Sequence, residues 1–230
     1  MNTLTLGMLW YLAFIFSTTV HEAAHAWAAL RLGDPTAYRG GQVTLDPIPH
    51  IRREPIGTVL FPVVSYLVGG WMMGWASAPY DPLWADRYPR RAAWMAFAGP
   101  AANLLIAVVT GLLIHLGLWL GVFMEPSTAR FTQITLAVSP GLWQGVAVLV
   151  SIVFTLNLIL FSFNLIPLLP LDGAAAVMLL MSERVAARYR AIMLNPAFSM
   201  FGLLFAWRAY DPVFRPLFRL ALGLLYPGLF

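Results

Sequence analysis

Three side chains suited to metal chemistry lie close together near the N-terminus: His21, Glu22 and His25. On a helix, two residues four positions apart leave the same face one turn apart, so both imidazoles can bind one metal ion. Glu22 lies beside them, where its carboxylate can reach a water molecule at that ion. The structural alternative is a buried His–Glu hydrogen-bonded network that joins two helices. We favour the metal site, because ionisable groups with apolar flanks are costly unless they are paired or bind a metal.

The motif lies in an apolar run, residues 4–30, that is long enough to cross a bilayer. Of the 230 residues, 60% are hydrophobic and only 10% are charged, which is the composition of a membrane protein. The N-terminus has no positively charged stretch and no cleavage site, so we expect a retained helix rather than a signal peptide. We therefore predict an all-α polytopic membrane protein. It would be one integral membrane domain, residues 1–230, built as a bundle of about four to six transmembrane helices.

Other stretches supply the remaining elements. Proline and glycine interrupt residues 56–76, which form either a broken span or a re-entrant segment. Residues 92–122 and 141–166 are long enough to span. Beyond a core of residues 4–181, the C-terminal part holds one or two short hydrophobic segments, 191–207 and 213–230. Residues 38–49 are β-prone and end in proline, so we expect one or two small strands at the membrane surface.

Arginine supplies all fourteen basic residues, and ten of them lie in three polar segments, 31–56, 77–91 and 183–190. By the positive-inside rule, these segments face the cytoplasm. With two of them on that side, the stretch 56–76 between them must enter and leave the membrane at the same face, which favours the re-entrant interpretation. The net charge of +4 reflects this orientation rather than nucleic-acid binding, since no basic stripe interleaves with exposed aromatic residues.

Two histidines do not complete a catalytic zinc site, which takes three protein ligands. The chain has no cysteine, and Asp172 is the one acid at the end of a spanning helix. The topology places it at the depth of His25, just after a double-proline break. Alternatively, Asp172 merely caps the helix that starts at Gly173. The other histidines are less suitable: we expect His115 to be packed or interfacial near the opposite face, and His50 to be interfacial in a surface loop, where it could contact substrate.

Three stretches of the chain form an ordered set: His21-Glu22-Ala23-Ala24-His25, then Ala98-Gly99-Pro100-Ala101-Ala102-Asn103, then Asn164-Leu165-Ile166-Pro167-Leu168-Leu169-Pro170-Leu171-Asp172-Gly173. In this order they resemble the motifs of the site-2 protease family, which are intramembrane zinc metalloproteases. The chain is most similar to the compact prokaryotic members without PDZ or CBS domains, and the resemblance runs to about residue 181. One departure is visible at His50, which Ile51, Arg52 and Arg53 follow where compact members tend to continue with Ile-Asp-Pro.

The resemblance implies one zinc ion per chain with three protein ligands: His21, His25 and Asp172. It also implies that Glu22 is the catalytic base and that Asn103 and Asn164 line the substrate or oxyanion site. The residues themselves leave an interhelical hydrogen bond as the alternative for both asparagines. The expected partners are the lipid bilayer and a transmembrane protein substrate. The expected location is a prokaryotic cell membrane, with the active site toward the cytoplasm.

A substrate helix must unwind locally before its peptide bond can be cut, and the freed backbone groups then need partners. We expect the strand around Gln42, Val43 and Thr44 to offer its edge to such a substrate. Two other functions stay open: a polytopic metal-binding transporter or channel, and a membrane scaffold that binds helices without cutting them. The spans hold no other carboxylate before Asp172, which counts against a transport path. The intact set of ligands and base counts against the scaffold.

Overall fold

The computed structural model describes residues 2–193 and 196–228 of the chain. Its elements follow in the order α1 (Thr3–Leu32), α2 (Thr36–Arg39), α3 (Pro47–Arg53), η1 (Ile56–Leu60), α4 (Phe61–Gly69), α5 (Pro82–Arg87), α6 (Pro89–Trp119), β1 (Phe123–Met124), β2 (Leu136–Ala137), α7 (Leu142–Asn164), α8 (Gly173–Ala176), η2 (Val177–Leu180), α9 (Glu183–Met193) and α10 (Pro196–Leu225). Of these, η1 is a π-helical segment and η2 a short 3₁₀ helix.

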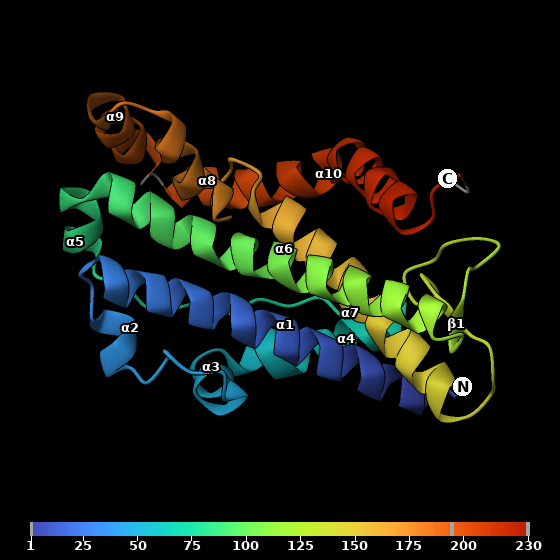
Figure 1. Cartoon of the computed structure of the whole chain (residues 1–230). Helices are drawn as coiled ribbons and strands as arrows, with labels where there is room; N and C mark the ends of the chain where they lie inside the picture. The colour runs from blue at the N-terminus through green and yellow to red at the C-terminus, as the bar shows by residue number, and fades with distance from the viewer. Residues whose placement is uncertain (1, 194–195, 229–230) are drawn as a thin grey trace.

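Three long helices, α1, α6 and α7, pack against one another at the centre of the molecule. Figure 1 shows α1 and α6 side by side over most of their length. α1 begins after Asn2, whose side chain accepts a hydrogen bond from the Thr5 N–H, and ends at Gly33, whose φ of 106° suits glycine. α6 begins with Pro89, at a position where a missing N–H costs nothing. Both helices therefore start on residues that suit an N-terminus, and α1 also stops on a residue that suits a C-terminus.

The central helices also have the properties of membrane spans. Among the described residues, only α1, α6 and α7 are both long and apolar enough to cross a membrane. Large apolar side chains on their outer faces, such as Leu12, Leu105 and Leu112, are more than half exposed, as suits contact with lipid. α10 is as long as α1, but its exposed face carries four charged residues: Arg208, Asp211, Arg215 and Arg219. The predicted class, an all-α polytopic membrane protein, is confirmed.

The stretch 56–76 turns back on itself. η1 and α4 together span only residues 56–69, and the chain then returns so that the Trp75 N–H donates to the Gly57 carbonyl at 3.1 Å. A little further on, the N–H of Asp81 donates to the carboxylate of Asp34, just beyond the end of α1. The segment therefore leaves the bundle at the end where it entered, in agreement with the re-entrant interpretation.

The strands expected over residues 38–49 are absent, which corrects that prediction. α2, an irregular loop and α3 occupy this stretch. Asp46 accepts a hydrogen bond from the Ile48 N–H, and Pro47 fits the first turn, so a helix begins where a strand was expected. β-prone residues form a strand only beside a partner strand, and this loop has none within the part of the chain that the structure describes. Among the described residues the only sheet is the antiparallel pair β1–β2, which lies between α6 and α7 in the sequence.

One long helix, α10, covers most of the one or two C-terminal segments expected at 191–207 and 213–230. Residues 191–193 belong to α9, and parts of both stretches lie outside the described residues. α10 continues through Pro212 and Pro216. Its inner face joins an apolar cluster with α6 and α7 that includes Phe214, Leu222 and Leu225. Burial of this face outweighs the local cost of two prolines.

Candidate metal centre

Two histidines and one aspartate meet between α1 and the start of α8. The ligand atoms of His21, His25 and Asp172 lie within 4.8 Å of one another. The His21 Nε2 is 3.0 Å from the His25 Nε2 and 3.1 Å from the Asp172 Oδ2. The His25 Nε2 is 3.3 Å from the Asp172 Oδ1. The three residues that the sequence predicts as ligands are thus in contact, although His21 and Asp172 are 151 positions apart in the chain.

Neither structural alternative raised by the sequence describes this cluster. Asp172 precedes α8, yet its side chain makes no capping hydrogen bond. Glu22 is only 5% exposed, and its buried Oε2 has no hydrogen-bond partner among the described residues, whereas a His–Glu network would have paired it with an imidazole. A buried oxygen without a partner is costly. The Glu22 Oε2 is therefore available to accept a hydrogen bond from a bound molecule.

The donor set and its spacing fit zinc. Two imidazole nitrogens and one carboxylate oxygen are ligands that catalytic zinc takes, with a further position for water or substrate. Zinc–ligand bonds of about 2.0–2.1 Å at tetrahedral angles separate the ligand atoms by roughly 3.3 Å. The separations given above run from 3.0 to 3.3 Å. Zinc is therefore the cofactor that these donors suit, as the sequence predicted.

Gly99 allows α6 to pass close to the Nε2 atoms of the two imidazoles, on the side that faces Asp172. A Cβ at this position would lie 2.6 Å from the Nε2 of His21 and would also collide with the ring of His25. Real Cβ atoms do not approach other atoms so closely, so a side chain here would push α6 away from α1. The sequence shows the glycine within a motif, but only the packing explains it.

Each imidazole is also held through its other ring nitrogen, Nδ1, on the side away from the cluster. The His25 Nδ1 lies 2.8 Å from the Met95 carbonyl, and the His21 Nδ1 lies 2.5 Å from the Asn103 Oδ1. Metal-binding histidines usually donate their second N–H in this way. Asn103 is 0% exposed, so it faces the back of His21 rather than an open substrate site. The contact matches the interhelical hydrogen bond that the sequence left as the alternative to an oxyanion role.

Of the two asparagines on α7, Asn157 rather than Asn164 contacts Asn103. The Asn164 Nδ2 donates to its own helix, at the Leu160 carbonyl, and the side chain is partly exposed. Its role in substrate binding stays a prediction. Asn157 is 0% exposed and accepts a hydrogen bond from the Asn103 Nδ2 at 2.7 Å. The seven-residue spacing puts both asparagines on one face, so the signal was present, but the motif pointed to Asn164.

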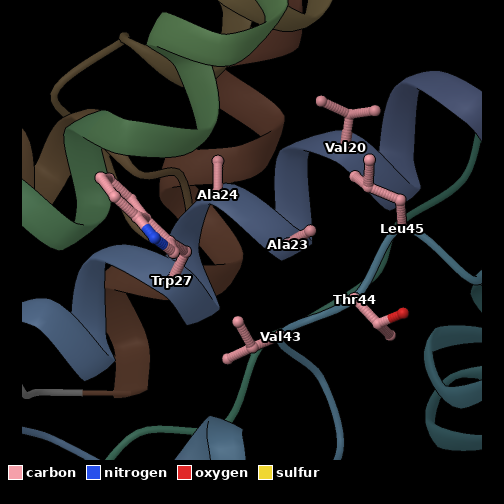
Figure 2. A pocket seen from close by; sticks show the side chains of 7 residues that line it. All are labelled: Val20, Ala23, Ala24, Trp27, Val43, Thr44 and Leu45. Atoms are coloured by element: carbon pink, nitrogen blue, oxygen red, sulfur yellow. The ribbon is translucent and has the colours of Figure 1, made fainter.

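An apolar groove of about 430 Å³ lies between α1 and the loop before α3 (Figure 2). Its walls are formed by Val20, Ala23, Ala24, Trp27, Val43, Thr44 and Leu45. Figure 2 shows the loop passing beside the turn of α1 that carries Ala23. Among the described residues, the backbone N–H groups of Val43, Thr44 and Leu45 have no acceptor. The loop thus presents free donors beside an apolar surface.

Two buried polar side chains hold this loop in place. The Gln42 Nε2 donates to the Pro49 carbonyl at 3.0 Å, and the His50 Nε2 lies 3.1 Å from the Thr44 carbonyl. Gln42 and His50 are 4% and 2% exposed. The expected interfacial position of His50 is therefore wrong, because its ring is used inside the loop. Gln42 likewise points inward, which leaves Val43 and Thr44 as the outer part of the expected edge.

Comparison with known proteins agrees with this geometry. A model of peptidase family M50 matches residues 9–206. The chain is 37% identical to "Putative zinc metalloprotease YwhC" of Bacillus subtilis, over 70% of this chain and 64% of that protein. It is 30% identical to "Putative zinc metalloprotease Rip2" of Mycolicibacterium smegmatis, over 71% of this chain and 54% of that protein. The chain thus spans less than two thirds of either relative, and no solved structure matches it.

The family match begins within α1, ahead of the two histidines, and extends into α10, so it covers every residue of the candidate centre. The resemblance to site-2 proteases is confirmed: this chain belongs to peptidase family M50.

Proposed function

We propose that this protein is an intramembrane zinc endopeptidase that hydrolyses a peptide bond within or near a transmembrane segment of another membrane protein. The observation that carries the proposal is the cluster of His21, His25 and Asp172 at zinc spacing, close to helices of spanning length. Glu22, on the same turn of α1, adds a buried carboxylate oxygen without a partner among the described residues. Membership of family M50 and similarity to proteins named as zinc metalloproteases support the same reaction.

In this proposal His21, His25 and Asp172 hold the ion, and Glu22 handles protons. Zinc, when bound, supplies a Lewis acid that polarises the scissile carbonyl and makes water a better nucleophile. The Glu22 carboxylate accepts a proton from the attacking water and later delivers it to the leaving amine. Its burial favours this role, because no bond within the described residues competes for the lone pairs of Oε2.

The loop beside α1 offers a place for an unwound substrate. Freed backbone carbonyls of a substrate need donors, which lipid does not provide. The free N–H groups of Val43, Thr44 and Leu45 are such donors, and the groove between them and Trp27 accepts apolar side chains. We propose that the substrate lies along this loop as an added strand. The loop would become a strand only when that partner is bound, in line with its irregular form here.

The arginine-rich end of the molecule supports a cytoplasmic active site. Figure 1 shows α2, α5 and α9 gathered at one end of the bundle, and these helices carry Arg39, Arg87 and Arg184. His25 lies near that end too, two turns before α1 stops. By the positive-inside rule this end faces the cytoplasm, here of a prokaryotic cell.

The function is tested by Glu22→Gln in purified, zinc-loaded protein. The variant keeps the size of the side chain but removes the base, so cleavage of a model transmembrane substrate should fall by about 10²–10⁴-fold. Zinc content, measured by elemental analysis, should stay at that of the wild type, since Glu22 is not one of the clustered ligands.

The matched control is Glu183→Gln, which neutralises an exposed carboxylate at the start of α9 and should cleave like the wild type. Equal cleavage by wild type and Glu22→Gln would remove Glu22 from the mechanism. Metal flux through liposomes that survives Glu22→Gln, without any cleavage, would favour a transporter instead.

A further inference from the structure

A chain of buried side-chain hydrogen bonds runs behind His21 and crosses all three central helices. The Asn103 Oδ1 on α6 lies 2.5 Å from the His21 Nδ1. The Asn103 Nδ2 donates to the Asn157 Oδ1 on α7 at 2.7 Å, and the Asn157 Nδ2 donates to the Ser17 Oγ on α1 at 2.8 Å. Asn103, Asn157 and Ser17 are all 0% exposed. Hydrogen bonds between polar groups this deep are expensive to leave unmade.

The polarity of the chain is fixed by backbone carbonyls at its far end. The second contact of the Asn157 Nδ2 is the Val153 carbonyl at 2.8 Å, and a carbonyl can only accept. The Ser17 hydroxyl uses its one hydrogen on the Ala13 carbonyl at 2.7 Å, so it too accepts from Asn157. The amide of Asn157 therefore cannot turn around, and its Oδ1 must face Asn103.

The direction then passes step by step to the metal ligand. Because Asn157 presents an oxygen, Asn103 must present its Nδ2 to it and its Oδ1 to His21. An oxygen acceptor requires the proton of His21 to sit on Nδ1. The Nε2 that faces His25 and Asp172 is then the unprotonated nitrogen, which is the form that binds a metal. His25 reaches the same state in one step, because its Nδ1 faces the Met95 carbonyl.

We propose that Asn157 is a positioning residue that, through Asn103, sets the tautomer and orientation of His21 for zinc binding. This inference rests on the proposed metal site, and it assigns Asn103 to the support of a ligand rather than to the oxyanion. It gives a role to Asn157, which contacts neither a ligand nor the groove.

The test measures zinc affinity by competition with a chelator of known affinity, without any cleavage assay. Asn103→Ala and Asn157→Leu should each weaken zinc binding about 10–100-fold, as loss of an outer hydrogen bond to a ligand does. The matched control is Thr155→Val on α7, since Thr155 is 0% exposed and its Oγ1 has no partner among the described residues. The control should bind zinc like the wild type.

Zinc affinity of Asn157→Leu within twofold of the wild type would overturn the proposal. Retained zinc affinity in Asn103→Ala would likewise overturn it, because Asn103 would then not support His21. A second measurement needs no variant: ¹⁵N NMR of histidine-labelled, zinc-loaded wild-type protein, which has four histidines, should show the His21 ring protonated at Nδ1 and metal-bound at Nε2. The opposite arrangement would also overturn the proposal. Neither readout depends on protease activity, so the proposed function can fail or stand separately.

Discussion

At the scale of single residues, Gly99 shows how tightly the metal centre is built. α6 lies against both imidazoles at Gly99, a point where it has no side chain. The same contact brings Asn103, one turn further along α6, to the back of His21. Ligand spacing and ligand orientation therefore depend on one close approach of two helices.

Gly99→Ala should accordingly disrupt the centre. The added methyl group would collide with both rings, so α6 must shift at a cost of about 1–3 kcal/mol for overpacking. Because the shift also moves Asn103, we expect zinc affinity to fall at least ~10-fold, as measured by chelator competition.

The matched control for Gly99→Ala is Gly111→Ala on the same helix, where a Cβ would lie 3.4 Å from the Phe154 ring, an ordinary contact. It should bind zinc normally. Normal zinc affinity in Gly99→Ala would show that α6 can yield without moving the ligands.

Residue-level prediction from sequence worked where the geometry is local. His21 and His25 could be paired because four residues make one turn of any helix. The motif pointed to Asn164 instead of Asn157, and helical periodicity could not tell the two apart because both share a face of α7. Only the offset between α6 and α7 along their axes decides which of them meets Asn103, and that offset is a property of packing.

At the scale of elements, the loop before α3 is the part whose form differs most from the prediction. Residues 38–49 have the composition of a strand, yet composition describes a preference for pairing. No described segment lies beside them as a pairing partner. The buried side chains of Gln42 and His50 instead fix the loop from within. Its outer backbone stays free, which is what the proposed substrate contact requires.

Val43→Pro tests that contact. Proline removes one N–H that has no acceptor among the described residues, so it breaks no bond described in the free protein. If this N–H pairs with the substrate, cleavage of a model transmembrane substrate should fall at least ~10-fold while zinc content stays normal.

Val43→Ala serves as the comparison, because it trims the side chain but keeps the N–H. It should retain far more activity than Val43→Pro. Undiminished cleavage by the proline variant would discard the added-strand proposal and leave the metal centre untouched.

At the scale of the whole molecule, the proposed zinc site joins parts of the chain that are distant in sequence. His21 and His25 belong to the first long helix, whereas Asp172 follows α7. Ligand binding to the folded state alone stabilises it, by about 2.7 kcal/mol at a ligand concentration 100 times the dissociation constant. Bound zinc should therefore act on the stability of the whole bundle.

Removal of zinc by dialysis against a chelator should lower the Tm of the detergent-solubilised protein by several degrees, and added zinc should restore it. Asp172→Asn should reduce this zinc-dependent shift, because the amide is a poorer ligand. A Tm that does not respond to zinc in the wild type would argue against a site that ties α1 to the start of α8.

The molecule's class and its long helices follow from the sequence, since an apolar run of spanning length has few alternatives. The path of residues 56–76 needed the arginine distribution as well, and the structure agrees with it. The form of the C-terminal part could not be predicted, because two prolines suggest a break that burial of the inner face of α10 overrides.

The hydrogen bonds among Ser17, Asn103 and Asn157 also have a mechanical consequence. They connect α1, α6 and α7 at a single level. None of these helices can therefore slide along another without leaving an amide group unpaired in an apolar interior. Axial motion of the three central helices is thus blocked at the level of the candidate metal centre. Any rearrangement that admits a large ligand must therefore come from the peripheral elements, which are the hairpin of η1 and α4 and the outer helix α10.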